Sequence, residues 1–73
     1  MMMEYTVIYE RGDTNWSAYV PDLPGCIATG KDRADTEKYI REAIEFHLEG
    51  MHLRGEIIPA PTVEAGTVSV QAA

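Results

Sequence analysis

The stretch from Val20 to Gly30 limits the folds open to this chain more than any other part of its sequence. Within it, Pro21 and Pro24 each fix φ and remove a backbone amide donor, so neither residue suits the middle of a sheet. Pro24 is followed by Gly25, and this pair suits the fixed φ and then the positive φ of a type II turn. The stretch is therefore predicted to be a rigid, turned link between two strands.

Three short strands are predicted from the alternation of apolar and polar side chains. They comprise residues 4–10, 16–20 and 26–29. In the first strand, Tyr5, Val7 and Tyr9 share one face. A polar loop that contains a glycine joins the first two strands, and the link joins the second to the third, so the three strands form an antiparallel meander.

An amphipathic helix is predicted after the third strand. Asp32 is a suitable N-cap, and Asp35 lies three residues later, at the second position of an acidic capping box. The helix is expected to end at about Arg54, because Gly55 is a typical residue for the left-handed position that follows a helix. Farther on, the alternating residues 67–70 predict a fourth strand, which a right-handed crossover would return parallel to the first or third strand.

The helix carries more apolar surface than packing against one sheet requires. The stripe expected to face the sheet consists of Ile40, Ala43, Ile44, His47, Leu48 and Met51. Tyr39, Phe46 and Leu53 widen this apolar face on one side. We expect these three side chains to line a dimer or partner contact. The alternative is that the loop from Glu56 to Gly66 folds back over Tyr39 and Phe46.

Length and charge bear on assembly and on partners. A chain of 73 residues has a small core, and its one cysteine leaves no disulfide to reinforce that core, so a homodimer or larger assembly is expected. Twelve Asp and Glu against six Lys and Arg give a net charge of −6, and the sequence has no basic stripe of the kind that binds nucleic-acid phosphates. An acidic surface suits a basic protein partner, although such a charge also serves simply to keep a small protein soluble.

The sequence offers no signal peptide pattern and no apolar run near the roughly 18 residues that span a membrane, so a cytoplasmic protein is expected. No residues with catalytic or metal-ligand spacing stand out, and neither enzyme activity, nor a cofactor, nor a metal is predicted. His47 is interpreted as a core histidine, and Cys26 as a small buried side chain. Pro21, Asp22, Pro24 and Gly25 are assigned to structuring the turn. There Asp22 is expected to accept bonds from amides of its own turn, with a partner contact as the alternative.

Three short stretches resemble the N-terminal domain of HicB-like antitoxins of type II toxin–antitoxin systems. They are Pro21-Asp22-Leu23-Pro24-Gly25-Cys26, Glu42-Ala43-Ile44 and Pro59-Ala60-Pro61. The resemblance implies a partial ribonuclease H-like fold of the α+β class, with two layers, a four-stranded mixed sheet in the order 3-2-1-4 and one helix on one face. It also implies a non-enzymatic module that binds and occludes a small, basic, RNA-cleaving toxin of the HicA type.

Complete members of this family usually carry a C-terminal DNA-binding domain. Only twelve residues follow Pro61, so residues 1–73 are expected to be a single HicB-like domain without one. Two other functions stay open at this point. One is an orphan homo-oligomeric binding protein without a toxin. The other is a minimal metal-dependent nuclease that uses Asp22, Glu4 or Glu10, which is less favoured because such catalysis needs several carboxylates around metal ions.

Overall fold

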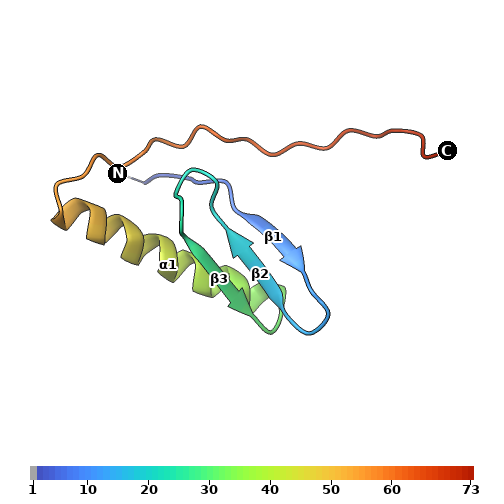
Figure 1. Ribbon diagram of the computed structural model, residues 1–73, viewed down its shortest axis with the longest axis horizontal. Helices are drawn as coiled ribbons and strands as arrows, with labels where there is room; N and C mark the ends of the chain where they lie inside the picture. Colours follow the sequence, from blue (N-terminus) through green and yellow to red (C-terminus); the bar gives the residue numbers. More distant parts are fainter. Residues whose placement is uncertain (1) are drawn as a thin grey trace.

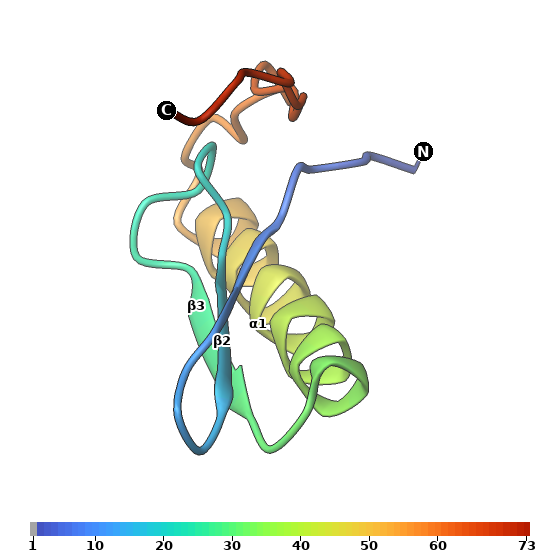
Figure 2. The same cartoon turned by 90° about the vertical axis from the view of Figure 1, so that its right-hand side faces the viewer.

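The computed structural model describes residues 2–73, which contain three strands and one helix (Figure 1). In chain order these are β1 (Ile8–Arg11), β2 (Trp16–Tyr19), β3 (Ile27–Gly30) and α1 (Arg33–Leu53). The strands form an antiparallel sheet in the order β1-β2-β3. The helix lies against one face of this sheet, so the folded part of the chain has two layers (Figure 2).

The core lies between the helix and the covered face of the sheet. Its buried side chains, each at most 3 % exposed, are Ala18, Val20, Leu23, Cys26 and Ile40. Ala28 pairs with Ala18 across β2 and β3 and packs on the same core. Because side chains alternate along a strand, the next pair, Tyr19 and Ile27, lies on the uncovered face, where Ile27 is 68 % exposed.

Two consecutive turns make up the link between β2 and β3. The Leu23 N–H donates to the Val20 carbonyl (3.0 Å), and the Cys26 N–H donates to the Leu23 carbonyl (3.0 Å). Gly25 has a φ of +84°, in the region that the second turn requires and that a side chain disfavours. Leu23 lies between the two turns and is 1 % exposed, so the link itself contributes a side chain to the core.

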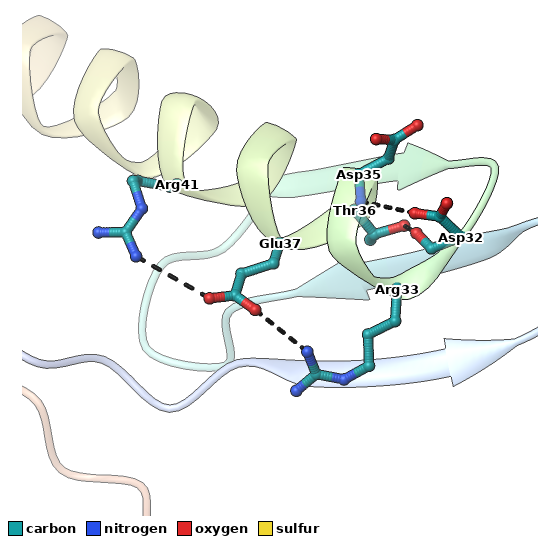
Figure 3. A network of polar contacts seen from close by, with 6 residues as sticks. All are labelled: Asp32, Arg33, Asp35, Thr36, Glu37 and Arg41. Carbon is teal, nitrogen blue, oxygen red and sulfur yellow. Dashed lines mark hydrogen bonds and ion pairs between the residues drawn. The ribbon is translucent and has the colours of Figure 1, made fainter.

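Hydrogen bonds define both ends of α1. At its start, the Asp35 N–H donates to the Asp32 carboxylate (2.7 Å), and the buried Thr36 hydroxyl donates to the Asp32 carbonyl (2.7 Å) (Figure 3). At its end, Gly55 has a φ of +71°, and the Glu56 N–H donates back to a carbonyl of the last turn (2.9 Å), as in a Schellman motif. The predicted N-cap and the predicted stop of the helix are both confirmed.

Gly30, the last residue of β3, lies against the first turn of α1. A Cβ atom at this position would lie 2.7 Å from the backbone nitrogen of Thr36, so the strand and helix approach closely here because glycine has no side chain.

Ion pairs lie on the exposed side of the first turns of α1. Glu37 pairs with Arg33 (3.2 Å) and with Arg41 (4.0 Å) (Figure 3). Exposed ion pairs of this kind contribute only about 0–1 kcal/mol each to stability.

The predicted four-stranded mixed sheet in the order 3-2-1-4 is wrong, because the sheet formed within residues 2–73 has three strands, all antiparallel. The predicted fourth strand, residues 67–70, belongs to an extended tail, which we define as residues 56–73. This tail passes close to the N-terminal segment and then runs beyond the sheet to the C-terminus (Figure 1). Its last part therefore lies away from β1, which the fourth strand was expected to join.

The first strand is also shorter than the predicted residues 4–10. Ile8 pairs with Tyr19, so that Thr6 comes opposite Pro21 when the register is continued toward the N-terminus. Since Pro21 has no amide hydrogen and begins the turned link, the ladder between β1 and β2 cannot extend that far. Residues 4–7 consequently lead into β1 without a partner strand among the described residues.

Candidate functional site

The carboxylate of Asp22 binds the tail. Its Oδ2 accepts hydrogen bonds from the backbone amides of Thr62 (3.0 Å) and Val63 (3.1 Å), and its Oδ1 accepts one from the Thr62 hydroxyl (2.7 Å). These bonds, first that of the Thr62 hydroxyl and then those of the two amides, hold the pKa of Asp22 below its ordinary value. Asp22 therefore serves a segment 40 residues away rather than the amides of its own turn.

The N-terminal segment holds the same part of the tail. The Tyr5 hydroxyl donates to the Pro59 carbonyl (2.5 Å), and the Thr6 hydroxyl donates to the Val63 carbonyl (2.5 Å). Partial burial, and secondarily the negative charge of Asp22, raise the pKa of Tyr5. Together with the bonds to Asp22, these contacts fix the tail between Pro59 and Val63 and set the direction in which it leaves the body of the protein.

The tail does not cover the widened apolar face of the helix. Tyr39, Phe46 and Leu53 are 43 %, 79 % and 76 % exposed, so the alternative in which the loop after the helix folds back over Tyr39 and Phe46 is wrong. These residues are spaced by seven, close to two turns, and therefore follow one line along α1, which we call the helix strip. The structure thus leaves three large apolar side chains in solvent on one helix.

Acidic residues border the helix strip. Glu42 and Glu49 each stand four residues before a member of the strip, one helical turn away, and both are exposed. An apolar line with carboxylates along one side suits a partner that presents apolar side chains within a basic surface.

A groove opens on the other side of the helix, between α1 and the N-terminal part of the chain. Its volume is about 740 Å³. The apolar side chains that line it come from residues 2–9 and from the middle of the helix, and they include Tyr5, Val7, Tyr9, Ile40, Ile44 and Leu48. Ile58, just before the fixed part of the tail, also contributes to this lining. The sequence reading missed this groove, because Tyr5, Val7 and Tyr9 were assigned to a strand with neighbours on both sides.

The structure also places the other candidate residues, Cys26 and His47, and bears on a metal site. Within residues 2–73, no three His, Cys, Asp or Glu side chains are grouped so that they could hold a metal ion. Cys26 is 3 % exposed, and its burial raises the pKa of the thiol. His47, which was predicted to be a core histidine, is half-buried on α1. No helix in this described part of the chain is long and apolar enough to cross a membrane.

Comparison with known proteins identifies relatives over most of the chain. Residues 5–71 match the family described as the HicB-like antitoxin of bacterial toxin–antitoxin systems. A UPF0150 protein of Thermoplasma acidophilum is 36 % identical over 67 residues, which cover 90 % of this chain and 97 % of that protein. An uncharacterized 14.9 kDa protein from the rep-hol intergenic region of Haemophilus phage HP1 is 35 % identical over 78 % of this chain, but the match spans only 43 % of the phage protein.

A solved structure shares the fold. It is the HicA3 and HicB3 toxin–antitoxin complex, one chain of which superposes with a TM-score of 0.70 at 28 % sequence identity. The match covers 82 % of this chain and 70 % of the other.

Proposed function

Because the chain belongs to the HicB-like antitoxin family, we propose that it binds a small, basic, RNA-cleaving toxin of the HicA type and blocks the RNA-binding face of that toxin. The helix strip carries this proposal, since Tyr39, Phe46 and Leu53 stay exposed and have no partner among the described residues. A solved complex of a related fold with its toxin supports a toxin as the partner.

Charge favours a basic toxin over a second copy at the helix strip. The chain has a net charge of −6, and Glu42 and Glu49 border the strip. Two strips facing each other would bring like charges together, whereas a basic partner would pair with them. The apolar side chains would supply the buried centre of such a contact, and the acidic residues would supply its rim.

The proposed inhibition is stoichiometric and needs no catalysis by this chain. A toxin whose basic RNA-binding face is occupied by an acidic protein cannot bind an RNA backbone at the same time. We therefore expect one bound chain to silence one toxin molecule. We also propose that the chain self-associates, through a surface other than the helix strip.

The test first looks for a small basic protein encoded beside this chain and then measures binding to it by calorimetry. Replacing Phe46 with Ala removes the most exposed large side chain of the helix strip and should weaken binding at least about tenfold, as for a central interface aromatic. Ile27→Ala is the matched control, because Ile27 is also an exposed apolar side chain but lies on the uncovered face of the sheet. It should leave the affinity unchanged.

Other outcomes would redirect the proposal. If Phe46→Ala and Ile27→Ala weaken toxin binding equally, the helix strip is not the toxin contact. If no small basic protein is encoded beside this chain, and if the chain does not rescue cells that express HicA-type toxins, the orphan homo-oligomeric binding protein would be favoured instead. Cleavage of labelled RNA by the purified chain with Mg²⁺, abolished by Asp22→Asn, would contradict the non-enzymatic role.

A further inference from the structure

The tail carries exposed apolar side chains that its own chain does not cover. Val68 and Val70 are 85 % and 81 % exposed. They are two residues apart in extended backbone, so both side chains project to the same side, whereas Thr67 and Ser69 project to the other. The C-terminal part of the tail thus has the pattern of a strand with one apolar face, although it pairs with nothing in the described part of its own chain.

The groove and the edge of β1 beside it are complementary to such a segment. Within residues 2–73, the outer edge of β1 has no partner strand, and its backbone groups are free to pair with an added strand. Next to this edge, Tyr5, Val7 and Tyr9 face Ile40 and the following apolar residues of α1 across a groove of about 740 Å³. A segment lying along β1 would therefore pair its backbone with the edge and place alternate side chains in the groove.

The end of the tail does not enter the groove of its own chain. Asp22 and the N-terminal segment fix it between Pro59 and Val63, and from there it runs beyond the sheet (Figure 1). The molecule measures 51 × 27 × 20 Å, and the projecting tail lies along its longest dimension. To reach its own groove, the tail would have to turn away from this course after Val63.

We propose that two copies of this chain exchange tails, so that residues 67–70 of one copy lie along β1 of the other, with Val68 and Val70 in its groove. Each copy offers one tail and one groove, so the exchange closes as a twofold dimer. Both apolar surfaces are covered by this arrangement, and the helix strip stays free. The proposal deepens the self-association proposed above and is independent of toxin binding.

Matched variants of the full chain test the exchange. Val68→Asn/Val70→Asn makes the apolar face of the segment polar, whereas Thr67→Asn/Ser69→Asn makes the same change on the other face. Light scattering at micromolar concentration should give twice the chain mass of 8.1 kDa for the wild type and for the second variant. The first variant should have a dimer dissociation constant at least about tenfold higher.

Disulfide trapping identifies which chain supplies the segment. A copy carrying Val70→Cys is mixed with a copy carrying Val7→Cys and oxidised, and a covalent heterodimer is expected. A chain carrying both substitutions that cross-links within itself, or a wild type that is monomeric, would overturn the exchange. So would a Phe46→Ala variant that is monomeric, because the dimer contact would then be the helix strip. Toxin binding by the dissociated Val68→Asn/Val70→Asn variant separates failure of the exchange from failure of the proposed function.

Discussion

The carboxylate of Asp22 binds both the backbone amide and the hydroxyl of Thr62, which follows it by 40 residues. This contact joins the link between β2 and β3 to the segment that follows α1. Asp22 lies within the turned link, where Pro21 directly precedes it and its other neighbour, Leu23, is 1 % exposed. The tail is therefore bound to a rigid part of the fold.

Replacing Asp22 with Asn should release the tail without unfolding the protein. An amide has one acceptor oxygen in place of two, and it lacks the charge that strengthens hydrogen bonds from amides. Hydrogen exchange at Thr62 and Val63 should accelerate at least about tenfold, whereas exchange in β2 and α1 should stay unchanged. Mass spectrometry of peptic fragments measures both, and unchanged exchange at Thr62 would contradict the role given to Asp22.

The bond between Asp22 and the tail should depend on pH in the acidic range. The pKa of Asp22 is lowered in the folded chain, so the attachment is fully formed above the ordinary value of 3.8 and is lost as the pH falls through the lowered value. Amide resonances of Thr62 and Val63, followed by NMR, should shift with a midpoint below 3.8. Asp22→Asn should abolish this transition, and a wild-type midpoint above 3.8 would contradict the prediction.

Two glycines should respond to alanine in opposite directions. Gly30→Ala would place a Cβ atom 2.7 Å from the Thr36 nitrogen, so strand and helix must separate, at a cost of about 1–3 kcal/mol. Gly50→Ala meets only the end of the flexible Arg54 side chain at 3.0 Å, so the gain in helix propensity should stabilise the fold by about 0.5–1 kcal/mol. Urea unfolding followed by circular dichroism measures both, and Gly66→Ala, in open space, is the control.

The thiol of Cys26 should react slowly in the folded protein. The side chain is 3 % exposed, and its burial raises the thiol pKa, so less of the reactive thiolate is present at neutral pH. Alkylation by iodoacetamide at pH 8 should be at least about tenfold slower than in urea. Equal rates in the two conditions would place Cys26 outside the core.

Local signals in the sequence predicted the parts of the fold that depend on neighbouring residues. The proline and glycine positions of the link, the cap at Asp32 and the stop at Gly55 each follow from the conformation that one residue type prefers. The resemblance to HicB-like antitoxins, drawn from the link and from two other short stretches of the sequence, is confirmed by the family match over residues 5–71.

Such local signals do not predict contacts between residues that lie far apart in the sequence. Alternation in residues 67–70 indicates an extended backbone but does not specify its partner, and the predicted fourth strand failed for that reason. The bond from Asp22 to Thr62 has no sequence signature, because aspartate between prolines suits a local turn equally well. The helix strip was predictable as an excess of apolar surface, whereas its exposure depends on the path that the tail takes from Pro59 onward.

The position of Trp16 gives this protein a selective optical reporter. It is the one tryptophan of the chain, and it is half-buried at the start of β2, opposite Arg11 and Gly30. The tail is bound near the other end of that strand, beyond Val20. Tryptophan fluorescence will therefore report loss of the sheet but not detachment of the tail from Asp22. One fluorescence experiment thus separates global unfolding from release of the tail.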